Sequence, residues 1–399
     1  MIERKEYLEQ LFSYKNQQLI KVITGVRRCG KSTLFALYIE KLKKMGVSEE
    51  QIIDVNLEEL EYKKLQDYNE LYSYIEKRLH KKKYTYIFID EVQMCEGFEQ
   101  AVDSLFIKPM VDVYITGSNA YMLSGELATL LSGRYVTIDM LPLSFKEYFK
   151  TASNIDMNKS VSFNNYIKYG GFPYLTNLKQ EDNILKPYLE GVYNTILLKD
   201  VAKRAEISDI TLLENIIKTL MSSIGSTASI KKISNTLTST GRKTSRTTID
   251  KYIRALCDSY LFYKADRYDV KGRQYLKTQS KYYTVDTGLR NMLIMSESFD
   301  IGHQIENIVY LELLRRRYRV NIGKVDIQEV DFIVNSGDDT HYYQVAASVM
   351  DESTLARELV AFQKISDNHP KTLLTLDEIG DGANYNGIRQ KNLIDWLLD

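Results

Sequence analysis

The sequence of 399 residues predicts an α/β protein with a parallel-sheet core. Short β-branched runs alternate with helical runs up to residue 140, as they do where crossover helices join parallel strands. One strand-to-helix junction, Gly25–Ser32, also fits the phosphate-binding pattern G-x-x-x-x-G-K-[ST] in full. Together these observations predict a P-loop NTPase core.

The elements of this core follow from the spacing of apolar residues. Strands are expected where β-branched or aromatic residues run together, and helices where apolar residues recur every three or four positions. The expected helices cover residues 1–12, 31–45 and 68–79, and the expected strands cover 19–24, 52–57, 86–89, 111–116 and 135–140.

After Pro142 the pattern changes, and we expect four parts in all. Residues 1–144 would form the P-loop core, and 145–224 a helical lid that is broken at Gly170–Pro173. Residues 225–289 would form a winged-helix-like module, and 290–399 a C-terminal α/β domain. In that last part we expect helices at 304–317 and 354–366 and strands at 330–334, 342–346 and 372–375.

Composition excludes several classes of protein. Lys and Arg together number 53, as do Asp and Glu, so the net charge favours no partner. The cysteines Cys29, Cys95 and Cys257 are too few and too scattered for a disulfide framework or a zinc site. No run of about 18 apolar residues occurs, so we expect no membrane span and a cytoplasmic location.

The loop predicts a site for ATP and Mg²⁺. Its glycines let the backbone N–H groups face the phosphates, and the following helix adds partial positive charge. Lys31 is expected to reach the β- and γ-phosphates, and Ser32 to ligate Mg²⁺. The residues expected to bind the nucleotide are Gly25, Val26, Arg27, Arg28, Cys29, Gly30, Lys31, Ser32 and Thr33.

Two carboxylates that end a buried strand are the expected partners of this loop. Asp90 would hold Mg²⁺ through water, and Glu91 would orient and activate the attacking water. The alternative for this pair is a solvated turn. Two adjacent carboxylates with separate tasks favour hydrolysis over simple nucleotide holding.

Two further residues are candidates for catalysis. Asn119, with Ser118 next to it, ends another strand and would sense the γ-phosphate. Arg134 precedes the strand at 135–140 and would act as an arginine finger, within the chain or on a neighbouring subunit. A hydrogen-bonded turn and a solvated arginine are the respective alternatives.

The segment after the lid is locally basic and predicts a helix-turn-helix. Residues 226–299 carry 14 Lys and Arg against 6 Asp and Glu, whereas 300–399 carry 10 against 17. Apolar faces recur over 230–237 and 244–256. The second of these helices would read DNA, with Lys243, Arg246 and Lys251 as phosphate contacts. A module that packs domains or binds a protein is the alternative.

These motifs closely resemble a large family of bacterial and archaeal AAA-superfamily P-loop ATPases with a C-terminal domain of unknown function. The resemblance implies an ATPase core, a helical lid, a winged-helix module and a restriction-endonuclease-like fold at the C-terminus. The runs that carry it are Val22–Leu34, Phe88–Gln93, Ile115–Asn119, Leu131–Tyr135, Leu141–Tyr148, Tyr169–Pro173 and Leu198–Val201.

Nucleases with that fold hold Mg²⁺ with acidic residues and usually use a lysine. Transferred to this sequence, the acidic positions are Glu306 and Asp331. Gln344 stands where a carboxylate is expected, and Ala346 stands where the lysine is expected. We therefore expect an inactive remnant that serves protein contacts or regulation, with ordinary carboxylates at Glu306 and Asp331 as the alternative.

The leading functional hypothesis is a Mg²⁺-dependent ATPase whose nucleotide state switches its C-terminal modules and which binds DNA through the winged helix. The second is a nucleotide-gated, protein-binding regulator with negligible turnover and no DNA binding. The third is a nuclease licensed by ATP. The sequence leaves the protein partner open, as it does a homo-oligomer.

Overall fold

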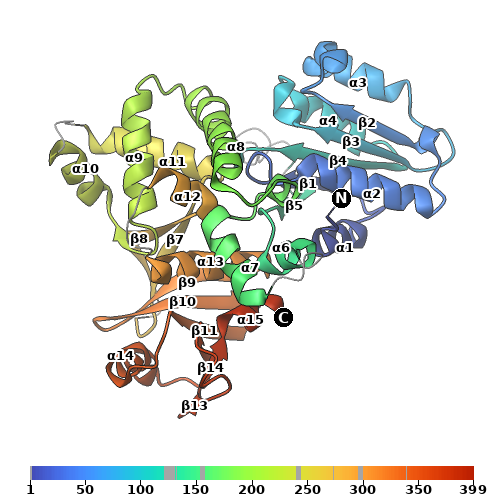
Figure 1. The fold of residues 1–399 in the computed structure, drawn as a ribbon. Coiled ribbons are helices and arrows are strands. Elements are labelled where there is room, and N and C mark those ends of the chain that lie inside the picture. Colours follow the sequence, from blue (N-terminus) through green and yellow to red (C-terminus); the bar gives the residue numbers. More distant parts are fainter. Residues whose placement is uncertain are drawn as a thin grey trace. The chain divides into compact units, whose positions relative to one another are not determined.

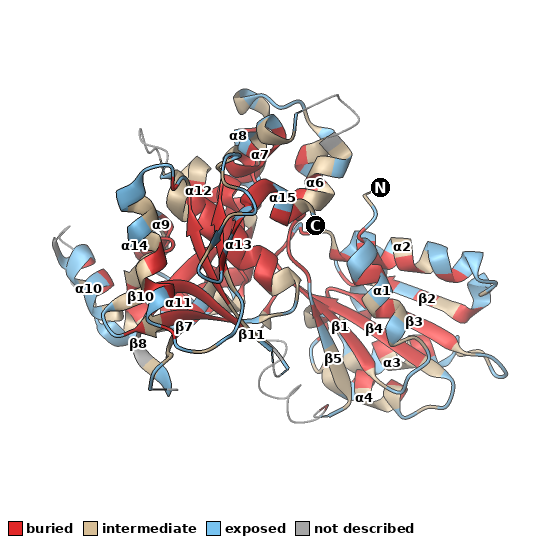
Figure 2. Ribbon diagram, turned by 90° about the horizontal axis from the view of Figure 1, so that it is seen from below, coloured by how far each residue is buried: buried red, intermediate tan, exposed pale blue. Residues whose placement is uncertain are grey.

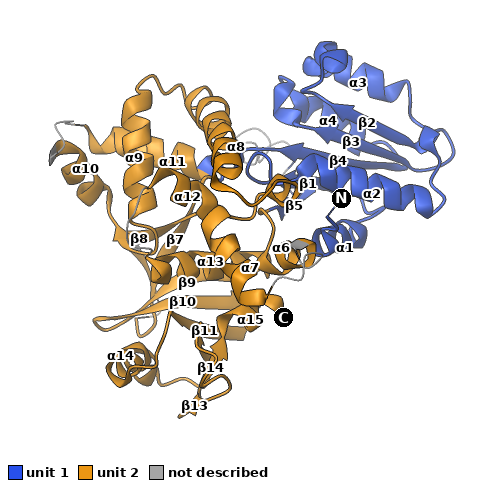
Figure 3. Ribbon diagram, in the orientation of Figure 1, with its two compact units in different colours: residues 1–140, 258–260 blue, residues 141–257, 261–399 orange. Residues whose placement is uncertain are grey.

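The computed structural model describes residues 2–120, 131, 133–152, 158–239, 244–272, 274–294, 300–337 and 339–399. These divide into two compact units (Figure 3). Unit 1 comprises residues 1–140 together with Asp258–Tyr260, and unit 2 comprises residues 141–257 and 261–399. None of the helices in the described ranges combines the length and apolar character needed to cross a membrane.

Unit 1 is a parallel sheet with helices on its faces (Figure 1). The strand order β2-β3-β4-β1-β5 places β1 between β4 and β5, and every pairing is parallel. The strands are β1 Ile20–Thr24, β2 Ile52–Asn56, β3 Thr85–Asp90, β4 Val111–Gly117 and β5 Tyr135–Asp139. The helices are α1 Lys5–Ser13, α2 Lys31–Lys44, α3 Tyr68–Glu76 and α4 Phe98–Phe106. The parallel core is confirmed, and its strands lie within a residue or two of the expected bounds.

The core of unit 1 forms because its central strands are mostly apolar, and the one buried ion pair among them joins Lys21 of β1 to Asp112 of β4. All six residues of β3 are buried, as are all five of β1 (Figure 2). A strand that is covered on both sides needs this composition, and helices supply the cover in parallel sheets. The polar ends of these strands therefore stand at the carboxyl edge of the sheet.

Unit 2 begins with helices and continues into a second sheet. Its helices are α6 Phe145–Ala152, α7 Lys159–Tyr169, α8 Asp182–Thr195, a π-helix Ile196–Ala202, α9 Ile210–Ser222, α10 Ile230–Ser239, α11 Arg246–Asp258, α12 Thr287–Leu293, α13 Ile301–Arg315, α14 Glu352–Gln363 and α15 Leu393–Leu398. Its strands are β6 Thr227–Ala228, β7 Phe262–Asp269, β8 Gln274–Thr284, β9 Arg319–Val325, β10 Gln328–Ser336, β11 Asp339–Ala346, β12 Lys371–Thr375, β13 Asn384–Tyr385 and β14 Ile388–Asn392.

All nine strands of unit 2 belong to one sheet, in the order β13-β14-β12-β11-β10-β9-β7-β8-β6. A parallel pairing of β7 with β9 joins strands β6 to β8 to the C-terminal strands, and in it Arg267 stands opposite Ile322. The strands on either side of the boundary that we expected at residue 289 therefore share one sheet. The elements expected of a winged helix occur in order along the chain, but their strands extend the C-terminal sheet. The assignments to winged-helix and restriction-endonuclease-like folds stay predictions.

Candidate functional site

The phosphate-binding loop connects β1 to α2 and depends on its two glycines. Gly25 has φ +147°, and a Cβ placed there would lie 2.1 Å from the carbonyl oxygen of Met140. Gly30 is left-handed, with φ +105°, and precedes the first turn of α2. No other residue type would allow both the turn and the close approach.

Lys31 is buried at the centre of this loop. Its ammonium donates to the carbonyl oxygens of Gly25, at 2.9 Å, and Val26, at 3.3 Å. The Glu91 carboxylate lies 3.8 Å away. The positive charge is therefore held inside the loop, where phosphate oxygens would compete with these partners.

Asp90 ends β3 and faces the start of α2. Its carboxylate is hydrogen-bonded to the Ser32 side chain and accepts from the Thr116 hydroxyl on β4. Burial raises the pKa of Asp90 above its usual range, although both hydroxyl contacts oppose that effect. A hydroxyl and a carboxylate are hard oxygen ligands, so the Ser32–Asp90 pair fits the predicted Mg²⁺ site.

Glu91 is held by its own backbone and by the side chains of Lys31, Arg27, Gln93 and Ser118. It has a left-handed φ of +52°, and its N–H donates to the Thr116 hydroxyl at 3.0 Å. Burial alone would raise the pKa of Glu91, but the charges of Lys31 and Arg27 outweigh it and lower the pKa. The Gln93 amide donates to the same carboxylate. The group is therefore ionised at neutral pH, as a water-positioning carboxylate must be.

Gln93 and Thr116 were not identified by sequence reasoning. Gln93 also lies 3.4 Å from the Ser118 hydroxyl, and Thr116 joins Asp90 to the Glu91 backbone. The sequence held one signal for Gln93, because a residue two positions beyond Glu91 in a tight turn can reach back to the Glu91 carboxylate.

The remaining loop residues divide by exposure. Arg28, Ser32 and Thr33 are exposed, whereas Cys29 is buried, and burial raises the pKa of its thiol. Arg27 is buried, 2.8 Å from Glu58 and 3.9 Å from Glu91. Arg27 thus holds the carboxylate as well as lining the loop.

Ser118 and Asn119 follow β4, the strand next to β3. Both side chains are buried, with Asn119 only 3% exposed. This position agrees with the expectation that they lie beside the two carboxylates. The γ-phosphate role of Asn119 stays a prediction.

Arg134 lies at the amino edge of the sheet, away from the phosphate loop, and this position does not favour a role on its own chain's nucleotide, which stays a prediction. Tyr135 pairs with Ile20 at the start of β1, while Asp139 pairs with Thr24 beside the loop. Five residues of strand span roughly 15 Å. The Arg134 guanidinium instead forms an ion pair with Asp103 and stands 5.8 Å from the Phe106 ring. A role on a neighbouring subunit stays a prediction.

Two of the three residues expected to contact DNA lie within the described part of the chain. Lys243 lies outside the described residues. Arg246 begins α11, and both Arg246 and Lys251 are exposed, whereas Ile249 and Ile253 are buried on another face. The two cations therefore share the accessible side of the helix.

The C-terminal carboxylates gather around a lysine, which corrects the expectation drawn from Ala346. Lys281 of β8 lies 2.8 Å from both Glu306 and Glu329, and 3.9 Å from Asp331. Burial opposes the charge of Lys281, but the three carboxylates together raise its pKa above the ordinary value. Sequence reasoning sought the lysine beside Gln344, whereas a strand from the preceding segment provides it.

Residues around this cluster also donate hydrogen bonds to its carboxylates. Tyr283 donates to Glu306 at 2.6 Å, and the Val345 N–H donates to Asp331 at 2.8 Å. Gln344 donates to Glu358 and accepts from the Asp331 N–H. The described residues contain no group of three or more potential metal ligands. The ammonium thus takes the central position that a divalent cation would need.

Comparison with known proteins agrees with the fold of unit 1. Residues 17–149 match the family described as "AAA domain", and residues 160–300 match a "Domain of unknown function (DUF8612)". An uncharacterized protein of Haemophilus influenzae is 40% identical over 100% of this chain and 99% of its own length. One from Methanocaldococcus jannaschii is 32% identical over 86% of this chain and 78% of its own length.

Among solved structures, a Walker-type ATPase of Pyrococcus abyssi is similar over 73% of this chain and 96% of that one. It shows 14% identity and a TM-score of 0.48. The AAA match itself covers the loop, Asp90, Glu91 and Asn119. Residues 17–149 are therefore an AAA-type P-loop domain.

The cluster around Lys281 generates a test of its role. Replacing Lys281 with Met leaves Glu306 and Asp331 buried without their cation, which should cost about 3–5 kcal/mol of unfolding free energy. Chemical denaturation of unit 2, followed by fluorescence of its single Trp396, measures the loss.

The matched control is Lys264→Met on the neighbouring strand, where the lysine is half-exposed and pairs only with Asp266. That change should cost less than about 1 kcal/mol. Equal stability of the two variants would contradict a structural role for Lys281.

Proposed function

This chain belongs to one family with the Haemophilus influenzae and Methanocaldococcus jannaschii proteins, and we propose that it is a Mg²⁺-dependent ATPase. Its nucleotide state would be passed to the C-terminal modules. One observation carries the proposal: a complete phosphate loop places the buried Lys31 ammonium 3.8 Å from an ionised Glu91.

Each residue of the site has a distinct task in this proposal. The loop N–H groups and Lys31 bind the phosphates, while Ser32 and Asp90 would hold Mg²⁺, which neutralises charge on the phosphate oxygens. Glu91 orients the water that attacks the γ-phosphate. Asn119 fixes the γ-phosphate from the neighbouring strand.

Release of Glu91 is the step that would make the site active. Lys31 and Arg27 attract both the Glu91 carboxylate and any phosphate that enters the loop. Since phosphate oxygens carry more charge, they would displace the carboxylate from Lys31. Glu91, still hydrogen-bonded to Gln93, would then be free to accept a water proton.

A three-residue segment supports the coupling. Asp258–Tyr260 belong to unit 1, although in the chain they run from the last residue of α11 towards β7. The buried Tyr260 hydroxyl is hydrogen-bonded to Thr24, which donates to Asp139 at 2.6 Å. Thr24 directly precedes Gly25 of the phosphate loop. A shift of the loop would therefore reach the end of α11 through the hydrogen bond between Thr24 and Tyr260.

DNA is the proposed partner of α11. Its accessible face carries Arg246 and Lys251, neither of which forms an ion pair with a described residue. Cations that are free to release counterions from phosphates give salt-dependent, sequence-independent affinity. A protein partner is the alternative for this surface.

The catalytic proposal is tested with Glu91→Gln. This change keeps the shape and the Gln93 contact but removes the base, so turnover should fall on the order of 10²-fold or more with ATP affinity retained. Phosphate release and nucleotide binding are measured on the same preparation.

Lys31→Ala is the companion variant and should lose both binding and turnover. Unchanged turnover in Lys31→Ala would refute the ATPase proposal. Tight ATP binding by the natural protein without phosphate release would favour the nucleotide-gated regulator.

The coupling is tested with Tyr260→Phe, which preserves packing and removes only the hydroxyl. We expect ATP affinity within about twofold of the natural protein, because Tyr260 does not line the loop. ATP should no longer change the rate at which proteases cut α10 and α11. Tyr263→Phe on β7, where the ring is half-buried, serves as a control for the loss of a nearby tyrosine hydroxyl. A full ATP effect in Tyr260→Phe would contradict the coupling.

The DNA contact is tested by salt titration. Arg246→Ala should weaken binding of a DNA duplex and reduce the slope of log affinity against log salt by about one. Lys64→Ala removes the same charge from an exposed site in unit 1 and should leave that slope unchanged. No affinity in the natural protein, even at low salt, would assign the surface to a protein partner.

A further inference from the structure

Unit 2 contains a cavity that none of the proposed activities uses. Its volume is about 650 Å³, within the range of small-ligand sites. The β7–β8 hairpin forms one wall, and the chain after α14 forms another. Strands β9, β10 and β11 form the floor.

The rim of this cavity is cationic. Lys271, Arg319 and Lys364 line it, and all three are exposed. Lys271 is paired with Asp326, but Arg319 forms no ion pair within the described residues. The one carboxylate in the lining, Asp367, accepts a hydrogen bond from Tyr342 at 2.7 Å. The lining residues therefore carry more positive than negative charge, which favours a ligand with an anionic group.

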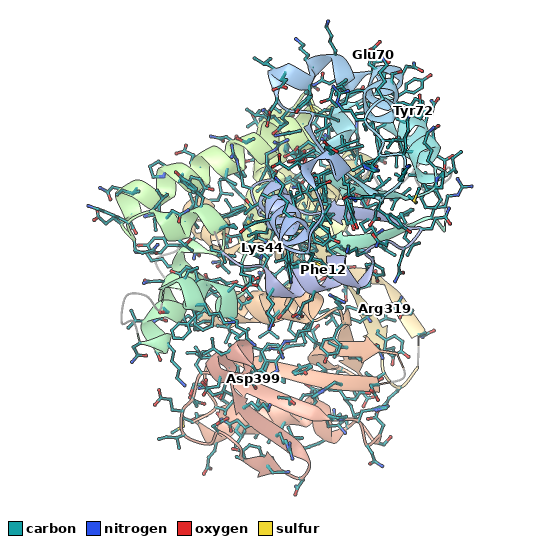
Figure 4. The ribbon with its side chains drawn as sticks, turned by 90° about the vertical axis from the view of Figure 1, so that its right-hand side faces the viewer. Phe12, Lys44, Glu70, Tyr72, Arg319 and Asp399 are labelled. Carbon is teal, nitrogen blue, oxygen red and sulfur yellow. The ribbon has the colours of Figure 1, made fainter. Side chains whose placement is uncertain are left out.

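Aromatic rings stand beside these cations. Tyr268 and Tyr275 meet edge to face with ring centres 5.2 Å apart, and the Arg319 guanidinium lies 5.1 Å from the Tyr275 ring. Tyr275 is 51% exposed, so its ring is accessible to a ligand. Arg319, labelled in Figure 4, begins β9 at this rim. A planar ligand would stack here against a tyrosine or a guanidinium.

The floor carries an unpartnered amide. Asn321 is 5% exposed and lines the cavity, and no described residue hydrogen-bonds to its side chain. Its cross-strand neighbour Ile333 gives it no polar contact. The amide thus faces the cavity with both a donor and an acceptor available, and a ligand that supplies the matching acceptor and donor would replace the water that solvates it.

We propose that this cavity binds a nucleoside monophosphate unit, with the base over Asn321 and the tyrosines and the phosphate on Arg319 and Lys364. The unit is either a free nucleotide or one residue of a single strand. The inference does not depend on the ATPase proposal, because the P-loop lies in the other unit.

The test uses the full chain with Lys31→Ala, so that the phosphate loop does not contribute. Binding of AMP and of a five-nucleotide single-stranded DNA is measured by calorimetry. We expect at least one probe to bind. Arg319→Ala should weaken that binding about tenfold or more, which corresponds to about 1.4 kcal/mol.

Asn321→Leu should have a similar effect, and Asn321→Ser replaces it if the leucine variant does not fold. Lys64→Ala is the charge-matched control and should bind normally. Affinity for AMP would identify a free nucleotide, whereas affinity for the oligonucleotide alone would identify a strand.

Three results would overturn the proposal. The first is no binding of either probe, and the second is equal binding by Arg319→Ala in a folded protein. The third is equal affinity for ribose 5-phosphate, which has no base and would remove the role of the tyrosines and Asn321.

Discussion

Compensation of buried charge is the constraint on which both units depend. A buried carboxylate or ammonium costs several kcal/mol unless a partner neutralises it. In unit 1, Lys31 and Arg27 lie within 4 Å of Glu91, and two hydroxyls hold Asp90. In unit 2, the single Lys281 ammonium serves three carboxylates from α13 and β10. The two arrangements differ in what they could bind. In unit 1, the proposed phosphate would replace Glu91 beside Lys31, whereas in unit 2 the carboxylates around Lys281 already have partners within the protein.

Much of unit 1 could be predicted from sequence because its determinants are local. A strand that is buried on both faces is a continuous apolar run, and the loop after it needs glycine at fixed positions. Gly25 illustrates this, since only glycine tolerates the Met140 carbonyl oxygen at that distance. The carboxylates at the end of β3 were also predictable, because parallel strands place their carboxyl ends at one edge.

The other features depend on pairing between distant segments. Arg134 was proposed as an arginine finger within the chain or on a neighbouring subunit, and only the register of β5 shows that it lies at the amino edge of that strand. Lys281 was missed because a motif search examines the neighbours of Gln344 and not another strand. The strand β9 was not expected, and it is the strand that joins β7 to the C-terminal sheet. Such contacts are set by tertiary packing, which local periodicity does not encode.

The continuous sheet explains why a small displacement in unit 1 could matter elsewhere in the chain. Tyr260 is followed by Leu261, whose backbone is bonded to Leu256 of α11 and to Val285. Beyond it, β7 pairs with both β8 and β9, and Lys281 ties β8 to α13 and β10. In the proposed coupling, a displacement at Thr24 would reach the end of α11 through Tyr260, and the strands paired with β7 are the first part of the sheet that it would meet.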